Sequence, residues 1–69
     1  MTFSTAVRRL LRERGWRLAT LERAAGFNKE GELSARLKHD YPRYNTMKRI
    51  ADGLGMKVWE IIKYAEETK

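Results

Sequence analysis

Basic side chains are the residues of this chain best suited to a chemical task, and that task is phosphate binding. Lysine and arginine number 15 against 9 aspartate and glutamate, which gives a net charge of +6 and an isoelectric point near 10.1. The excess is uneven: residues 1–38 hold nine cations and four anions, or +5, whereas residues 39–69 hold six and five, or +1. A small domain this basic is typical of nucleic-acid binding. The alternatives are an ordinary solvated surface, an acidic protein or an anionic lipid.

Catalysis and metal binding find no support in the residue types. The chain has no cysteine and one histidine, His39, and no pair of carboxylates accompanies it at the spacing of metal ligands. A nucleophile needs a base and a third group that orients the base, and no such set can be identified. We therefore expect no enzyme, no metal site, no cofactor and no small-molecule ligand.

The basic half of the chain contains the pattern of a helix that ends in a tight turn. Leu18, Leu21 and Ala25 recur at the spacing of one helix face. Gly26 follows them, where a helix commonly ends in the left-handed conformation that glycine adopts without strain. Phe27 is placed to cover this turn.

A second helix is expected directly after the turn. Asn28 is a candidate N-cap, and Leu33 and Leu37 form an apolar stripe. Two short helices joined at a glycine follow the plan of the helix-turn-helix, in which the second helix enters the DNA major groove. The alternative is an ordinary helical hairpin without a ligand.

The rest of the sequence predicts three more helices and no strand. Ser4 is a candidate cap for the first helix and Asn45 or Thr46 for the fourth, while Pro42 ends the third. The chain is thus expected to be all-α, a compact bundle of five short helices in a single domain, residues 1–69. The expected ranges are about 4–14, 18–25, 29–40, 45–54 and 58–66.

Apolar spacing also predicts the core. The clearest amphipathic pattern is the set Met47, Ile50, Ala51 and Leu54. The other residues expected to point inward are Val7, Leu10, Leu11, Val58, Ile61, Ile62 and Ala65, with Trp16 as a large anchor. No stretch is apolar enough to cross a bilayer, and neither a signal peptide nor a lipidation motif is present. We expect a cytoplasmic, nucleoid-associated protein.

The order of these parts resembles the lambda Cro/repressor-type helix-turn-helix family, also called Xre-like. Residues 12–16 and 21–26 match the family's opening, and residues 49–61 (RIADGLGMKVWEI) match its usual ending. Residues 33–37 followed by Tyr41-Pro42, with Leu18 at the start of the second helix, resemble the Ner-like proteins of Mu-type phages. The resemblance covers roughly residues 6–62. It implies a lambda-repressor-like fold and a DNA-binding repressor, phage or bacterial, that acts by promoter occlusion.

The sequence departs from the family pattern in three ways. Leu18 replaces a glutamine that often contacts phosphate or base, and Glu22 replaces an alanine that packs on the third helix. The interval from Gly26 to Leu33 is one residue longer than usual. The third helix therefore begins at Lys29, or only at Gly31 or Glu32.

The face of the third helix opposite Leu33 and Leu37 is expected to contact the bases. At 100° per residue, Ala35 and Gly31 lie opposite that stripe, although Gly31 could equally belong to the turn. Ala35 is suited to a thymine methyl, Lys38 to a guanine or phosphate, and Glu32 to a cytosine amino group. The base-contact candidates are Lys29, Glu32, Ser34, Ala35, Lys38 and His39.

Phosphate contacts are expected mainly after the third helix. In the fold that the resemblance implies, this loop and the next helix N-terminus lie along the sugar-phosphate backbone, where free N–H groups favour an anion. At least one of Tyr41 and Tyr44 is expected to pack on the protein instead. The phosphate candidates are Arg17, Asn28, Arg36, Arg43, Tyr44, Asn45, Thr46 and Lys48.

Two aromatic residues of the last helix, Trp59 and Tyr64, serve either the core or a dimer contact. The leading hypothesis is a sequence-specific regulator that binds double-stranded DNA, with a homodimer on DNA as one form. The alternatives are an antitoxin-like or other protein-interaction module on the same fold, and a non-specific nucleoid binder.

Overall fold

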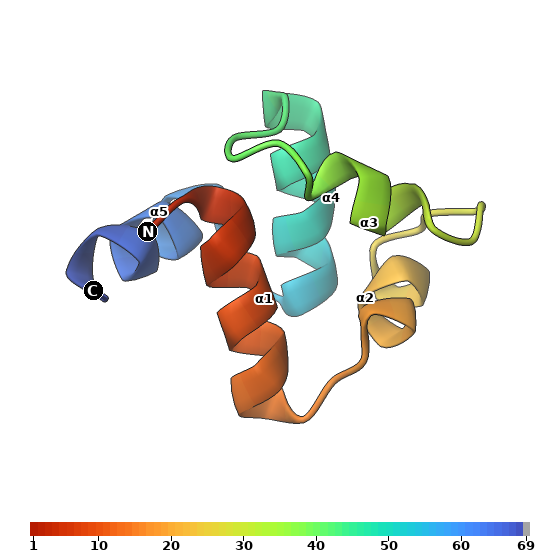
Figure 1. The fold of residues 1–69 in the computed structure, drawn as a ribbon, viewed down its shortest axis with the longest axis horizontal. Helices are drawn as coiled ribbons and strands as arrows, with labels where there is room; N and C mark the ends of the chain where they lie inside the picture. Colours follow the sequence, from red (N-terminus) through yellow and green to blue (C-terminus); the bar gives the residue numbers. More distant parts are fainter. Residues whose placement is uncertain (69) are drawn as a thin grey trace.

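Five helices joined by short connections make up the protein in a computed structural model that describes residues 1–68 (Figure 1). They are α1 (Phe3–Arg14), α2 (Leu18–Ala24), α3 (Glu32–Arg36), α4 (Tyr44–Leu54) and α5 (Val58–Glu67). The described residues contain no strand. The expected all-α class and the number of helices are confirmed.

The helices enclose one core to which each of them contributes. α1 packs on α5, α2 packs on α3 and α4, and α4 packs on α5. In Figure 1, α2 and α3 lie at one side of the molecule and α5 lies at the other. The described chain measures 31 × 25 × 20 Å. The largest fully buried side chains are Phe3, Val7, Leu21, Leu33, Ile50 and Ile61.

Burial confirms most of the predicted core. Leu10, Leu11, Leu37, Ala51, Leu54 and Ala65 are buried with the residues named above. Met47, Val58, Ile62 and Trp16 pack against this core but are partly exposed. Phe3 was not predicted, because the first helix was expected to begin only after it.

The first helix begins two residues earlier than the Ser4 cap predicted. Thr2 is the N-cap of α1, and its hydroxyl accepts a hydrogen bond from Thr5 N–H at 3.2 Å. Ser4 instead lies buried inside the helix, where its hydroxyl donates to the carbonyl of His39. Its backbone N–H donates to the Asp40 carbonyl at 3.1 Å. The start of α1 thus holds the chain segment that follows α3.

The predicted range of 29–40 for the third helix is wrong at both ends. The N-cap of α3 is Gly31, at a φ of 82°, and not Asn28, so the helix begins at Glu32. This start is the latest of the three that the sequence left open. The helix ends at Arg36, and the N–H groups of Lys38 and His39 donate to carbonyls three residues earlier, each at 3.3 Å. The carbonyls of His39 and Asp40 then accept hydrogen bonds from Ser4 on α1.

The fourth helix also begins earlier than expected. Its N-cap is Arg43 rather than Asn45 or Thr46, and the helix starts at Tyr44. The N-cap side chain, that of Arg43, makes no capping hydrogen bond to the first N–H groups of the helix. Those groups are therefore free for water or for an anion.

A glycine inside α4 sets the distance between α4 and α2. A Cβ on Gly53 would lie 3.0 Å from the Cβ and the backbone N of Ala25 and 3.0 Å from Leu21 Cδ1. Glycine is unfavourable in a helix interior by about 1 kcal/mol relative to alanine. Here it permits the close approach that places α2, and with it the turn leading to α3.

Candidate nucleic-acid interface

The turn between α2 and α3 begins as the sequence predicted. Gly26 has a φ of 79°, in the left-handed region. Its N–H donates to the Arg23 carbonyl at 3.2 Å, and the N–H of Phe27 donates to the Glu22 carbonyl at 2.9 Å. Phe27 is buried. The last turn of α2 is thus closed by backbone hydrogen bonds and covered by an aromatic ring.

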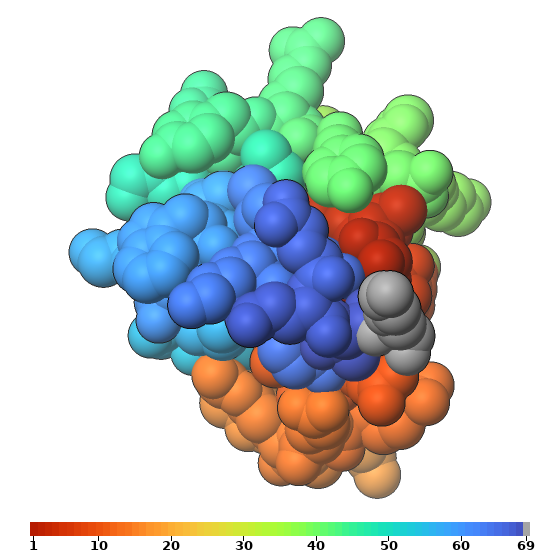
Figure 2. Space-filling view, turned by 90° about the vertical axis from the view of Figure 1, so that its left-hand side faces the viewer, coloured from red at the N-terminus to blue at the C-terminus, as the bar shows by residue number. Residues whose placement is uncertain are grey.

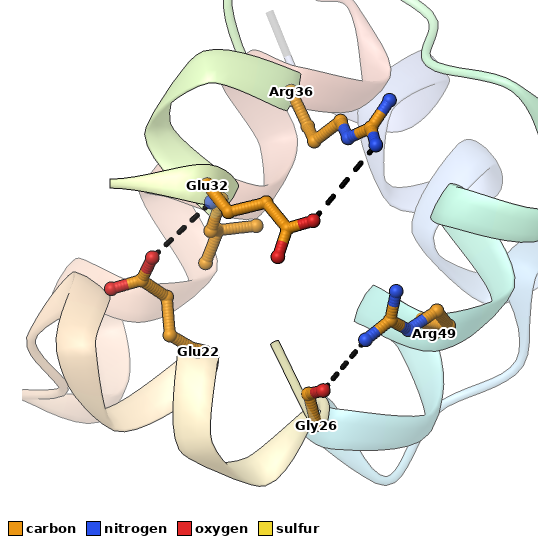
Figure 3. Close-up of polar contacts among 6 residues, drawn as sticks. Glu22, Gly26, Glu32, Arg36 and Arg49 are labelled. Atoms are coloured by element: carbon orange, nitrogen blue, oxygen red, sulfur yellow. Dashed lines mark hydrogen bonds and ion pairs between the residues drawn. The ribbon is translucent and has the colours of Figure 1, made fainter. Parts of the chain in front are cut away.

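Arg49 fixes this turn to α4, a role that sequence reasoning missed. Its guanidinium donates to the Gly26 carbonyl at 2.7 Å (Figure 3). The same guanidinium lies 4.2 Å from the centre of the Phe27 ring. Both partners lie more than 20 positions away in the chain, so no local pattern indicates the contact. Arg49 joins a hydrogen bond to a cation–π contact at one corner of the fold.

Glu22 connects α2 directly to the start of α3. Its Oε2 accepts a hydrogen bond from the Leu33 N–H at 3.2 Å (Figure 3). Gly31, the N-cap of α3, has no side chain to accept this N–H. Sequence reasoning noted Glu22 only as a departure from a family pattern and gave it no role.

The exposed face of α3 carries a small side chain, that of Ala35. Leu33 and Leu37 are buried, whereas Ala35 on the opposite side is exposed, as predicted. Glu32 and Ser34 are half-buried. The Glu32 carboxylate lies 3.9 Å from the Arg36 guanidinium, one turn along the helix (Figure 3). The face of α3 opposite Leu33 and Leu37 therefore presents the Ala35 methyl group, with the Glu32–Arg36 ion pair beside it.

The six base-contact candidates do not all lie on one helix. Glu32, Ser34 and Ala35 belong to α3, but Lys29 precedes it, and Lys38 and His39 follow it. Lys29, Lys38 and His39 are exposed. The expectation of one long recognition helix that carries all six is wrong, because α3 has only five residues.

A polar hollow brings together several predicted residues where α3 ends and α4 begins. Its volume is about 470 Å³. Arg36 contributes from α3, Arg43 and Thr46 from the start of α4, and His39 from the segment between them. Tyr41 and the buried Pro42 complete the lining. Two arginines thus line a hollow at the start of α4, where the N-cap side chain makes no capping hydrogen bond, an arrangement suited to a phosphate.

The other phosphate candidates are dispersed. Arg17 is the exposed N-cap of α2, and Asn28 lies exposed in the turn before α3. Asn45 is exposed on the first turn of α4. Lys48 forms an ion pair with Asp52 at 3.5 Å, and both side chains are solvent-exposed. Tyr44 and Lys48 line a different, apolar hollow between α4 and α5. Tyr41 and Tyr44 are each 61% exposed, so the expectation that at least one of them packs on the protein is wrong.

That apolar hollow belongs to the face where α5 lies. Figure 2 shows α5 at the centre of this face, with α4 beside it. Trp59 is 63% exposed at the hollow, whose volume is about 470 Å³. The other apolar lining residues are Met47, Ala51, Met56, Val58 and Ile62.

Tyr64 differs from Trp59 because it is held against α1. Its hydroxyl donates to Glu13 Oε2 at 2.7 Å. Desolvation, and then this hydrogen bond, raise the pKa of the Tyr64 hydroxyl above its ordinary value. Of the two dimer-contact candidates, Trp59 is the one that presents an unengaged aromatic ring.

Within residues 1–68, no helix is long and apolar enough to cross a membrane. In the same part of the chain, no group of three or more His, Cys, Asp or Glu side chains is arranged to hold a metal ion. Comparison with known proteins gives no matching family model, no matching curated protein and no matching solved structure. The function must be inferred from the residues of this chain.

Proposed function

We propose that the protein is a sequence-specific regulator that binds double-stranded DNA, with α2 and α3 as an Xre-like helix-turn-helix. The observation that carries the proposal is the position of Ala35. Its methyl group is exposed on α3 while Leu33 and Leu37 of the same element are buried, and the Arg36–Arg43 hollow begins where the helix ends. A small helix face beside a cationic hollow can approach base edges while phosphates are held alongside.

The division of labour follows from the two kinds of residue. Ala35, and the short polar Ser34, suit contacts to base edges, with Ala35 packing on a thymine methyl. The cations of the hollow, Arg36 and Arg43, hold the backbone and set the register without selecting a sequence. A protein docked in this way covers the duplex and represses transcription by excluding RNA polymerase from a promoter.

Arg43→Ala tests the phosphate assignment. Wild-type log K should fall linearly with log salt, with a slope that corresponds to roughly four to eight released counterions. The variant should flatten that slope by about one and weaken all DNA sequences alike, since a phosphate contact carries no sequence information. Fluorescence anisotropy at four salt concentrations measures both effects.

Lys63→Ala is the matched control for Arg43→Ala. It removes one exposed cation from α5, away from the hollow at α3 and α4, and should leave the slope at the wild-type value. An Arg43→Ala slope equal to that of Lys63→Ala would remove Arg43 from the phosphate set.

The exposed Trp59 favours a second candidate function, a protein-interaction module that uses the α4–α5 face. Large aromatic side chains that fill pockets are typical binding determinants in protein interfaces. The hollow beside Trp59 would receive an apolar side chain of a partner, or the Trp59 ring of a second copy. In this candidate function, an antitoxin-like role included, α3 has no part in binding.

Trp59→Ala separates the two candidates. Because the ring is largely exposed, the variant should melt within a few degrees of wild type. If DNA binding is the function, its affinity for a single DNA site should also match wild type. If the α4–α5 face is the functional surface, the variant should lose self-association or partner binding. Light scattering and a gel shift on the same samples record both properties.

A further inference from the structure

We propose that Glu22 is a specificity-determining positioning residue, because its carboxylate caps α3 from the neighbouring helix and so fixes the angle at which α3 is presented. This inference rests on the proposed DNA-binding function. It concerns a residue that itself contacts no base in that proposal. The contact that carries it is the hydrogen bond from Leu33 N–H to Glu22 Oε2 at 3.2 Å.

The local structure of α3 explains why such a cap is needed. The helix has five residues, and its N-cap is a glycine that offers no oxygen of its own side chain. Short helices are marginal without external support. The Leu33 side chain is fully buried, so its backbone N–H cannot turn away to water without disturbing the core. The Glu22 carboxylate is the acceptor that this N–H uses.

The position of this hydrogen bond lets it restrain the orientation of α3 relative to α2. Glu22 lies in the last turn of α2, two residues before the helix ends, and Leu33 is the second residue of α3. A hydrogen bond across this corner restrains the tilt of α3 relative to α2, while Arg49 restrains the turn from the α4 side. Figure 3 shows the two contacts on different sides of the corner. Buried Leu33 and Leu37 hold α3 on the core, and Glu22 sets how its exposed face is turned.

The energetic consequence is a trade between affinity and specificity. A carboxylate near a DNA-binding surface repels phosphate and lowers affinity for every sequence. A correctly oriented helix raises affinity only for the sequence it matches. The anion at this position favours specific binding if the affinity gained from the orientation of α3 exceeds the affinity lost to phosphate repulsion.

Three variants test the proposal. The probes are a duplex enriched from a random-sequence library by wild-type protein, and a random-sequence duplex of equal length. Glu22→Ala removes the acceptor and should weaken the enriched duplex roughly fivefold to thirtyfold, the range expected for loss of one cap. Its affinity for the random duplex should stay equal or rise. Glu22→Gln keeps an oxygen acceptor and should restore most of the ratio between the two affinities, while both duplexes bind more tightly.

Glu30→Ala is the matched control. Glu30 lines the same small hollow as Glu22, yet within residues 1–68 its carboxylate has no hydrogen bond or ion pair. Its removal should raise both affinities and leave their ratio unchanged. Hydrogen exchange at the Leu33 N–H provides a readout without DNA: it should accelerate in Glu22→Ala and stay near the wild-type rate in Glu22→Gln.

The outcomes keep this inference distinct from the proposed function. If wild-type protein enriches no sequence, the proposed function fails and the specificity role of Glu22 fails with it. If wild-type protein does enrich a sequence but Glu22→Ala keeps the wild-type affinity ratio, only the role of Glu22 is overturned. A lower melting temperature in Glu22→Ala with an unchanged ratio, measured well below the transition, also overturns it, because the contact would then serve stability alone.

Discussion

Ala35→Glu is expected to abolish specific DNA binding while the protein stays folded. The alanine side chain is exposed on α3, so a larger residue meets no core atoms. The backbone N–H of residue 35 would still donate to the Gly31 carbonyl, now at 3.0 Å. On DNA, however, the new carboxylate would lie where the helix approaches the duplex, and both phosphate repulsion and added bulk would oppose docking. A loss of at least roughly a hundredfold in affinity for an enriched duplex corresponds to two unfavourable contacts of ordinary size.

Ala35→Gln separates the two causes of this loss. It adds nearly the same bulk without the charge and should show an intermediate loss. Circular dichroism and thermal melting of both variants should match wild type, because neither change touches a buried residue. Tight binding to the enriched duplex by folded Ala35→Glu protein would contradict the assignment of α3 as the element that contacts the bases.

Ile50→Ala is expected to have the largest effect on stability. Ile50 is fully buried on α4, which packs against both α2 and α5. Removal of three carbon atoms from such a site should lower the free energy of unfolding by about 2–5 kcal/mol, through lost burial and the cavity left behind. Small domains have little stability to lose, so a large fraction of the variant should be unfolded at 37 °C.

Two comparison variants define this experiment. Ile50→Val should cost only about 0.5–1.5 kcal/mol because the cavity is smaller. Asp52→Ala changes an exposed residue of the same helix and loses only its ion pair with Lys48, which is worth at most about 1 kcal/mol. In urea denaturation, Ile50→Ala should have the lowest midpoint, Ile50→Val a higher one and Asp52→Ala the highest. An Ile50→Ala midpoint equal to that of Asp52→Ala would show that α4 is not central to the core.

The fold was predictable from the sequence where the signal was periodic or depended on a single residue type. The spacing of Ile50, Ala51 and Leu54 indicated α4, and Gly26 marked the end of α2 because a left-handed residue was needed there. Helix ends were less predictable. The start of α1 and both ends of α3 involve carbonyl and N–H groups that find partners on other segments of the chain. Ser4 meets the chain at His39, 35 positions away, and no local pattern contains that contact.

The candidate site shows the same limit more strongly. Residue type and position predicted Arg36, Arg43 and Thr46 as phosphate candidates, and in the structure all three line one hollow. Glu22 and Arg49 were missed because their partners, Leu33 on α3 and Gly26 in the turn after α2, lie 11 and 23 positions away. In the sequence, Glu22 is one charged residue on a helix, and only the folded chain shows that it accepts the Leu33 N–H. Contacts between segments far apart in the chain are harder to predict than the exposure of a side chain, which follows from helix spacing.

The central claim, sequence-specific binding of double-stranded DNA, is tested most directly by selection from a random-sequence duplex library. Wild-type protein should enrich one short sequence, and should bind it at least roughly a thousandfold more tightly than a scrambled duplex of the same length at the same salt concentration. Equal affinities for the enriched and scrambled duplexes, or no enrichment after repeated rounds, would contradict the account.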